Sequence, residues 1–317
     1  MSRKYTLSFC ILTCNQPDKL SRLLESLINQ NLESVEIIIR DDSNNTKSKV
    51  IVESYLSRIN IKYYHLKADG IDRAIQYVVK KARGQYVWMF GDDVLAPNAF
   101  EKVKTQIDNS KDLDFLYLNS SNFDRDQLGI QEFNDIATTD KDKFLMLIKD
   151  QLGFISALIF RANIVKDASI KDETSVGTHW LILYCSFFAI VNGSRFLYLA
   201  DIFFFSDDKP AGEVRWYDSY QVHSVRFSQE AIKFSNNFSP GVIRNLIRFK
   251  FHISWKAVVV ERALGLNTGF ASHTPKILQT LKTFWSYPDC YIAIFLFMLP
   301  RKILSIAYRF YLSKLRK

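Results

Sequence analysis

The sequence predicts an α/β fold in which a mostly parallel central sheet is flanked by helices and followed by a helical C-terminal extension. Over the first 120 residues, short continuous apolar runs alternate with stretches whose apolar residues lie three and four positions apart. These are the patterns of buried strands and amphipathic helices, and their alternation indicates parallel strands joined by crossover helices. With 317 residues, 48% of them hydrophobic, the chain can form a sizeable core and is not of the disordered class.

The first ninety residues contain the clearest strand and helix signals. In the first helix, the apolar residues Leu20, Leu23, Leu24, Leu27 and Ile28 follow the spacing of one helical face. The predicted order is a strand at Leu7–Leu12, a helix opening at Asp18, a strand at Val35–Ile39, a helix at 47–58, a strand at Ile61–Leu66, a helix at Ile71–Ala82 stopped by Gly84, and a strand at Tyr86–Phe90.

Beyond residue 112 the periodicity is looser. Strands are expected at Leu113–Leu118, Phe154–Phe160 and Phe196–Leu199, and a buried helix at Trp180–Val191. From Trp216 the pattern is helical almost throughout. The apolar run Cys290–Leu299 has ten residues, too few to cross a hydrocarbon core of about 30 Å, so it is expected to lie in a membrane interface.

Positive charge is concentrated near the C-terminus. Residues 240–317 contain thirteen Lys and Arg against two acids, a net charge of +11, which leaves −2 for residues 1–239 of a chain whose total is +9. The same region is rich in Phe, Tyr, Leu and Ile, which favours an anionic membrane surface over nucleic acid as its partner. The scattered cysteines (Cys10, Cys14, Cys185, Cys290) indicate buried thiols in a reducing cytosol, and no signal peptide is expected.

Two acidic pairs follow predicted strands. Asp41-Asp42 comes after the strand at Val35–Ile39, and Asp92-Asp93 comes after the strand at Tyr86–Phe90. Parallel sheets bind ligands beyond the carboxyl ends of their strands. Carboxylates there would hold Mg²⁺ or Mn²⁺, and such a cation neutralises a diphosphate leaving group. An isolated Asp-Asp pair is more often a solvated turn or a helix cap, so the assignment of a metal site depends on the sequence around the pair.

Those surroundings resemble the family 2 glycosyltransferases with the GT-A fold, which is Rossmann-like. The resemblance lies in Ser8–Asn15, Val35–Ser43 and Gly84–Asp93, at spacings of about 27 and 50 residues, and covers roughly residues 5–205. Gly70–Arg73 followed by Gly84–Asp93 is similar to the abequosyltransferase-like branch, bacterial enzymes of O-antigen or capsule assembly. The resemblance implies a catalytic domain at 1–212, with a nucleotide-sugar half (1–110) and an acceptor half (111–212), and a basic helical region at 213–317 that associates with a membrane or a partner.

The resemblance also implies roles at the strand ends. Thr13 would line the nucleobase pocket of a UDP-, dTDP-, CDP- or GDP-linked sugar, Asp42 would hydrogen-bond the base, and Asp41 would hold the strand end. Arg73 would lie near the base or the diphosphate, Asp92 near the ribose or the metal, and Asp93 would be the principal metal ligand. Val94 stands where the family commonly has a third Asp, which leaves the division of labour between Asp92 and Asp93 open.

A second departure concerns the base that takes the proton of the acceptor hydroxyl. The family commonly has an Asp at a helix start about ninety residues beyond the metal motif, whereas this chain reads Val176–Leu181 without an acid. His179 is the expected substitute, because an unperturbed imidazole titrates at a pKa of about 6.5. Glu173 and Asp172 are the alternatives, and a structural capping or core role for His179 stays open.

The acceptor is the part least determined by the sequence. A loop at Asp207–Gly212 and the pair Arg215-Trp216 would bind sugar or phosphate, or Trp216 would only anchor a helix. Inverting transfer to a lipid-diphosphate-linked saccharide is expected, on the inner face of a bacterial membrane, with the protein cytoplasmic and peripheral. A homo-oligomer built through the C-terminal region is the alternative use of that region.

Two other functions remain as alternatives. A nucleotidyltransferase would need a Gly-rich, basic phosphate loop after the first strand, where this chain has Thr13–Pro17, so it is disfavoured. An inactive scaffold that keeps the fold stays open because of the absent acid near His179 and the shortened Asp run, since a fold alone does not fix function.

Overall fold

The computed structural model describes residues 5–110, 112–122, 129–149, 151–206, 218–266 and 277–315. The chain forms two compact units, Met1–Asp208 and Lys209–Lys317, and each is described here by itself. The predicted acceptor elements Asp207–Gly212 and Arg215-Trp216 lie outside the described residues, as does the predicted domain boundary after residue 212.

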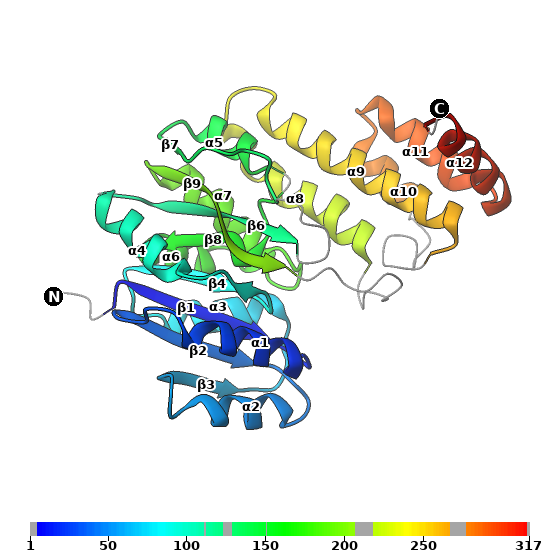
Figure 1. The fold of residues 1–317 in the computed structure, drawn as a ribbon. Helices are drawn as coiled ribbons and strands as arrows, with labels where there is room; N and C mark the ends of the chain where they lie inside the picture. Colours follow the sequence, from blue (N-terminus) through cyan, green and yellow to red (C-terminus); the bar gives the residue numbers. More distant parts are fainter. Residues whose placement is uncertain are drawn as a thin grey trace. The chain divides into compact units, whose positions relative to one another are not determined.

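The first unit is built on one mixed sheet with the strand order β3-β2-β1-β4-β8-β6-β9-β5, and β7 pairs with β9 (Figure 1). Its strands are β1 (Leu7–Thr13), β2 (Val35–Asp41), β3 (Ile61–His65), β4 (Tyr86–Phe90), β5 (Val94–Leu95), β6 (Phe115–Asn122), β7 (Ile136–Thr138), β8 (Leu158–Arg161) and β9 (Phe196–Ser206).

Helices cover both faces of this sheet (Figure 1). Contacts join α3, α6 and α7 into one layer, and α1 packs with α2 in another. The helices and 3₁₀ turns of this unit are α1 (Pro17–Ile28), α2 (Lys47–Tyr55), α3 (Ile71–Lys81), α4 (Ala99–Asn109), α5 (Lys141–Leu147), η1 (Ile155–Ala157), α6 (Ala162–Lys171), η2 (Glu173–Ser175) and α7 (Leu181–Asn192). The predicted α/β class is confirmed.

Strands β3, β2, β1 and β4 run parallel, and their register places their carboxyl ends at one edge. Leu7 pairs with Val35 on one side and Tyr86 on the other, so Thr13 lies opposite Asp41 and Ile11 lies opposite Phe90. Strand β8 is antiparallel to both β4 and β6, and β6 and β9 are parallel to each other. The edge formed by the carboxyl ends of β1, β2 and β4 is called the site edge below.

The core follows the predicted apolar runs. Every residue of β1 and β4 is buried, because both strands lie inside the sheet with helices on its two faces. The ring of Phe9 packs against those of Trp88, Phe90 and Phe100, at centroid distances of 5.1, 4.8 and 5.0 Å. Helix α1 buries Leu20, Leu23, Leu24 and Leu27, the face expected from the sequence.

One predicted strand was partly wrong. The apolar stretch at Phe154–Phe160 begins with the 3₁₀ turn η1, and only Leu158–Arg161 forms a strand. Ser156 explains the turn: its carbonyl accepts from the indole Nε1 of Trp88 at 2.8 Å, and its hydroxyl accepts from the backbone N–H of Gly91 at 3.0 Å. These two bonds keep the backbone at Ser156 from pairing with a neighbouring strand.

The cysteines also differ in part from expectation. Cys10, Cys185 and Cys290 are buried free thiols, but Cys14 is exposed, because it lies one residue past the end of β1. Partial desolvation of its sulfur, followed by the negative charges of Asp42 and Asp41, raises the pKa of the Cys14 thiol.

The second unit is helical in its described residues, which confirms the predicted helical C-terminal region. Its elements are the π-helical turn η3 (Gln221–Arg226), α8 (Phe227–Ile232), η4 (Ser235–Asn237), α9 (Val242–Leu264), α10 (Ile277–Phe284), α11 (Pro288–Met298) and α12 (Arg301–Leu315). Helices α11 and α12 both pack on α9, and the rings of Phe251 and Phe284 stack at 4.0 Å.

No single helix among the described residues is long and apolar enough to span a bilayer. Helix α11 and the first ten residues of α12 reach the required length and composition only as a pair, and that pair is bent by 116° at its break.

Candidate active site

The carboxyl ends of β1 and β2 are joined by a backbone bond, in which the N–H of Asp42 donates to the carbonyl of Thr13 at 2.9 Å. Thr13 is 7% exposed, and its hydroxyl Oγ1 has no hydrogen-bond partner among the described residues. A buried hydroxyl without a partner is uncommon, because desolvation is then uncompensated. The site edge therefore holds a polar atom that a ligand could satisfy.

The side chain of Asp41 makes its hydrogen bonds within the protein. Its side chain is fully buried, and its two oxygens accept from the N–H of Ser43 at 2.8 Å and from the hydroxyl of Tyr63 at 2.6 Å. Burial, together with the bond to Asp41 and its charge, raises the pKa of Tyr63. These contacts hold the end of β2.

Asp42 is held by Arg40 through two bonds, Nε to Oδ1 at 2.7 Å and Nη2 to Oδ2 at 3.3 Å. Burial raises the pKa of Asp42, and the nearby Asp69 and Asp41 raise it further, whereas Arg40 opposes the shift. Arg40 is itself 3% exposed, which is unusual for an Arg unless its donors are engaged.

Arg40 is a site residue that the sequence analysis missed. Beyond Asp42, its Nη1 donates to the carbonyl of Arg73 at 2.9 Å, its Nη2 pairs with Asp69, and its guanidinium lies 5.3 Å from the centre of the Tyr77 ring. A signal was present, since a single Arg interrupts the apolar strand directly before the acidic pair.

The loops after β1 and β2 are pinned to each other. The N–H of Asn15 donates to the hydroxyl of Ser43 at 2.8 Å, and the Asn15 side-chain oxygen accepts from the N–H of Asn44 at 3.2 Å. Asn15 has a φ of 54°, a left-handed conformation that Asn tolerates better than most residues. These bonds fix the rim beside Thr13 and Asp42.

Arg73 and Glu173, two predicted site residues a hundred positions apart, meet at the start of α3. Nη2 of Arg73 lies 3.2 Å from Oε2 of Glu173, and Nη1 donates to Gln76 at 2.8 Å. Both charged side chains are about half exposed, 46% for Arg73 and 62% for Glu173. Glu173 therefore has a cationic partner.

Asp172, the other alternative base, caps a turn. Its carboxylate accepts from the N–H of Thr174 at 2.9 Å, the Thr174 hydroxyl at 2.6 Å and the Ser175 hydroxyl at 3.0 Å. Three donors directed at one carboxylate engage most of its acceptor sites within the turn. These contacts describe a structural N-cap of η2.

Asp92 and Asp93 follow β4 at the site edge, where the turn is held by the Gly91 N–H bond to Ser156. Asp92 is paired with Lys19 of α1 at 3.1 Å, and Asp93 is 9% exposed. No cluster of three or more His, Cys, Asp or Glu that could hold a metal occurs among the described residues. Two carboxylates still fit Mg²⁺ or Mn²⁺ of the kind that takes its remaining ligands from substrate phosphates and water.

His179 lies in the left-handed region, with a φ of 69°, and its backbone N–H donates to the Asp72 carboxylate at 2.9 Å. The residue is partly exposed. Its neighbour Trp180 packs on Gly153 so closely that a Cβ there would lie 2.2 Å from the indole Cζ3. Since Ser156 bonds Gly91, the segment 153–156 touches both the His179 loop and the turn that carries the Asp pair.

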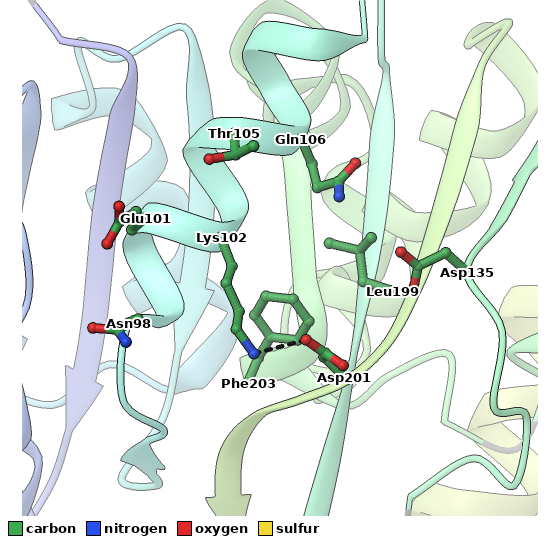
Figure 2. Close-up of a pocket in the computed structure, with 9 residues that line it drawn as sticks. All are labelled: Asn98, Glu101, Lys102, Thr105, Gln106, Asp135, Leu199, Asp201 and Phe203. Atoms are coloured by element: carbon green, nitrogen blue, oxygen red, sulfur yellow. Dashed lines mark hydrogen bonds and ion pairs between the residues drawn. The ribbon is translucent and has the colours of Figure 1, made fainter.

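A separate pocket of about 370 Å³ lies between α4 and β9 (Figure 2). Across it, Nζ of Lys102 pairs with Asp201 at 2.7 Å. The residues that line it are Asn98, Glu101, Lys102, Thr105, Gln106, Asp135, Leu199, Asp201 and Phe203. None of the predicted site residues is among them, so this pocket is distinct from the arrangement at the site edge.

The sequence is similar to that of known protein families and of curated proteins. The model of the family described as "Glycosyl transferase family 2" matches residues 8–174. Over 114 residues, 34% of each chain, the sequence is 32% identical to abequosyltransferase RfbV of Salmonella typhimurium. Over 97 residues it is 31% identical to the minor teichoic acid biosynthesis protein GgaB of Bacillus subtilis, covering 29% of this chain and 11% of that protein. The matched region thus spans about a third of the first of these curated relatives and about a tenth of the second.

Solved structures match over nearly the whole chain. S. aureus TarS 1–349 in complex with UDP has a TM-score of 0.68 at 18% identity, covering 96% of this chain and 91% of that one. The mannosyltransferase PcManGT from Pyrobaculum calidifontis, in complex with GDP-Man and Mn²⁺, has a TM-score of 0.53 at 12% identity, covering 95% and 87%. At these identities the likeness concerns the fold, and it confirms the predicted GT-A architecture.

Proposed function

Because the chain belongs to glycosyl transferase family 2, we propose that it transfers a sugar from a nucleotide-diphosphate sugar to a saccharide acceptor in the assembly of a bacterial surface polysaccharide. The observation that carries this proposal is the buried, unpartnered hydroxyl of Thr13 beside Asp42, at the carboxyl edge of parallel strands. The similarity to the abequosyltransferase and the teichoic acid protein supports the polysaccharide pathway.

The nucleobase binds at Thr13 and Asp42. The Thr13 hydroxyl gains there the hydrogen bond that it lacks in the protein, and Asp42 accepts from a ring N–H of the base. Each carboxylate oxygen has two lone pairs, so Asp42 can accept from a base while Arg40 holds it. The nucleotides bound by the similar folds, UDP and GDP-Man, support a nucleoside diphosphate as the carrier.

The diphosphate lies near Asp92, Asp93, Lys19 and Arg73. Asp92 and Asp93 would hold Mg²⁺ or Mn²⁺, and such a cation offsets the charge that develops on the leaving diphosphate. Lys19 and Arg73 add fixed positive charge at the site edge, although each is ion-paired with a carboxylate in the protein alone.

The proton of the acceptor hydroxyl is taken by the imidazole of His179. The acceptor oxygen forms a bond to the anomeric carbon as the bond from that carbon to the diphosphate oxygen breaks, and the electron pair leaves with the diphosphate. One displacement of this kind inverts the anomeric configuration. Glu173 is paired with Arg73 and Asp172 caps a turn, and these contacts argue against the two alternative bases.

The acceptor is a lipid-diphosphate-linked saccharide, and the second unit holds the enzyme at the cytoplasmic face of the membrane that carries it. Helices α10–α12 expose a set of large apolar side chains, called the apolar face below: Leu278, Leu281, Trp285, Tyr291, Ile292, Phe295, Met298, Ile303, Ile306 and Phe310. Lys282, Arg301, Lys302 and Arg309 are exposed on the same helices.

Charge complementarity supports an anionic bilayer as the proposed occupant of the apolar face. Residues 240–317 have a net charge of +11, and anionic lipid attracts each basic side chain near the surface by about 1 kcal/mol. An apolar set of this extent is uncommon on a free protein surface and marks an interaction site. The bend of 116° between α11 and α12 suits helices that lie on a bilayer.

The function is tested with purified protein, Mn²⁺ and UDP-, dTDP-, CDP- and GDP-linked sugars. One nucleotide should raise the thermal midpoint, because a ligand at a hundred times its dissociation constant stabilises the folded state by about 2.7 kcal/mol. The matching nucleotide sugar should release nucleotide when an acceptor is added. Thr13→Val keeps the shape but removes the hydroxyl, and it should weaken binding of that nucleotide. The absence of binding by all four nucleotides contradicts the proposal and favours the inactive scaffold.

A further inference from the structure

Asp72 is a buried carboxylate to which none of the proposed steps assigns a role. It lies in the first turn of α3 and is 3% exposed. Its oxygens accept from three backbone N–H groups of the loop that carries His179: Gly177 at 2.8 Å, His179 at 2.9 Å and Leu181 at 3.1 Å. These partners lie more than a hundred positions away in the sequence.

The loop conformation depends on this carboxylate. Gly177 and His179 have φ values of 85° and 69°, and the left-handed region is uncommon for residues other than Gly, although His adopts it more often than most. An anion that gathers several backbone N–H groups stabilises such a concave arrangement. Without Asp72, the three N–H groups lose their common acceptor and His179 loses the restraint on its backbone.

Asp72 also replaces a local cap. Helix α7 begins at Leu181, and Trp180 at its N-cap position makes no side-chain capping bond. Helix α5, by contrast, is capped by the adjacent Asp140, which accepts from Asp142 and Lys143. Capping is normally achieved from the neighbouring residue. In α7 the acceptor comes from another helix, so the start of α7 is tied to α3.

The turn that contains Asp72 is also bonded to the residues proposed to bind the nucleotide. The carbonyl of the next residue, Arg73, accepts from Arg40, and Arg40 holds Asp42. The backbone of His179 and the side chain of Asp42 are thus attached to the same turn of α3.

We propose that Asp72 is a positioning residue: it holds the backbone from Gly177 to Leu181 so that the His179 imidazole meets the acceptor hydroxyl. The inference rests on the proposed role of His179 as base. Asp72 acts through His179 and does not touch the substrate.

The test is a double-mutant cycle with Asp72→Ala, His179→Ala and the double variant, in which kcat and the donor KM are measured separately. Asp72→Ala should lower kcat by about 10²-fold, the loss expected from a misplacement of about 1 Å, and leave the donor KM within about twofold. The double variant should be no slower than His179→Ala, because residues that act as a unit are not additive.

Two further variants separate positioning from general loss of structure. Asp140→Ala removes a helix-capping carboxylate from α5 and should leave kcat unchanged. Asp72→Asn keeps the size of the side chain, so it serves if Asp72→Ala does not fold, and its kcat should also fall, because its amide nitrogen cannot accept from the loop.

The outcomes are distinct. An unchanged kcat in Asp72→Ala or Asp72→Asn, beside an impaired His179→Ala, overturns the positioning role and leaves the proposed function intact. Additive losses in the double variant overturn it as well, because Asp72 then acts independently of His179. Full activity in His179→Ala refutes the assigned base and this inference with it, whereas absence of transfer by the wild type contradicts the proposed function itself.

Discussion

The ammonium of Lys19 lies 3.1 Å from the carboxylate of Asp92, so the first acid of the proposed metal pair already has a cationic partner. Lys19 comes from α1 and Asp92 follows β4, and the pair joins these two elements at the site edge. A metal ion bound to Asp92 competes with the ammonium for the same oxygen atoms. The metal affinity of the protein alone should therefore depend on a residue that is not a ligand.

Replacing Lys19 with Gln should tighten Mn²⁺ binding to the donor-free protein. The pair is partly exposed, 23% and 38% for the two side chains, so its removal is worth only about 0.2–1 kcal/mol, or roughly a one-and-a-half- to fivefold change in affinity. Mn²⁺ binding can be followed by electron paramagnetic resonance. Lys102→Gln breaks a similar pair with Asp201 away from the site edge and should change nothing. Weaker Mn²⁺ binding in Lys19→Gln contradicts the competition.

Asp93→Asn should abolish turnover while the protein stays folded. The neutral amide is a much poorer ligand for Mg²⁺ or Mn²⁺ than a carboxylate. Asn has nearly the size of Asp, and the residue lies at a strand end, so the substitution should not disturb the fold. Nucleotide release with Mn²⁺ measures the first effect and the thermal midpoint the second. Asp108→Asn, on the exposed side of α4, is the matched control. Wild-type turnover in Asp93→Asn at the usual Mn²⁺ concentration excludes Asp93 as the principal ligand.

Glu36 should make the free energy of unfolding decrease at acidic pH. Burial opposes ionisation of Glu36, but bonds from Lys62 at 2.5 Å, Ser8 at 2.5 Å and the Arg83 N–H at 2.5 Å outweigh it and lower the pKa of Glu36 below its usual 4.5. The unfolded chain then takes up the proton first as the pH falls. The stabilisation is complete above about pH 4.5 and is lost below it, as the pH passes through the lower pKa of the folded state.

Glu36→Gln tests that effect directly. At pH 7 it should lower the free energy of unfolding by about 3 kcal/mol, the usual cost of breaking a buried ion pair from one side. Urea unfolding at several pH values should then show a smaller decline below pH 4.5 than in the wild type. Glu33→Gln, an exposed acid nearby, should keep the wild-type slope. An identical slope in Glu36→Gln and the wild type would assign the acid sensitivity to other groups.

Gly153→Ala should strain the packing under Trp180. The added methyl group would lie 2.2 Å from the indole, so either the ring or the backbone must move, at a cost of about 1–3 kcal/mol in unfolding free energy. The shift should also lower turnover, since His179 adjoins Trp180. For stability the control is Gly91→Ala, whose Cβ meets Ser156 at an ordinary 3.5 Å. Equal stability of the two variants would show that the Trp180 ring moves freely.

Full-length protein should float with vesicles containing anionic lipid and be partly released at high salt. Phe295→Glu and Ile306→Glu place charges in the apolar face, at side chains that are 58% and 70% exposed, and should reduce flotation. Phe133→Glu makes the same change at a 76% exposed side chain of the first unit and should float normally.

The alternative role of the apolar face is to join copies of the chain, and this role predicts a different result in the flotation experiment. If Phe295→Glu floats like the wild type but elutes as a smaller species in size-exclusion chromatography, the face joins copies of the chain and the bilayer proposal is wrong.

The parallel half of the sheet could be predicted because buried strands leave a simple signal. Strands β1, β2 and β4 are buried and rich in apolar residues, with Ile37–Ile39 and Tyr86–Phe90 as continuous apolar runs. Their ends, and with them Thr13, Asp42 and Asp92, could therefore be assigned to one edge. The turn η1 could not be predicted in this way, because apolar composition does not distinguish a short buried strand from a buried turn.

The supporting contacts of the site escaped the sequence analysis for a different reason. The bond from Arg40 to Arg73 spans 33 positions, and the bonds from Asp72 to the His179 loop span more than a hundred. Residue types alone do not specify such pairings, since Arg and Asp are ordinarily surface residues. The absence of an acid near His179 was visible in the sequence, but the buried carboxylate that accepts from the backbone N–H of His179 was not.

Arg40 distributes its donors among Asp42, Asp69 and the Arg73 carbonyl, and all of these partners belong to the protein. The proposed nucleotide end of the site is therefore preorganised: its shape exists in the protein alone, so that little conformational entropy would be lost when a ligand binds there. Lysine offers one ammonium in place of a planar fork and could not reach all three partners. A change at this position would alter how fast and how tightly the donor binds, without removing any atom that touches it.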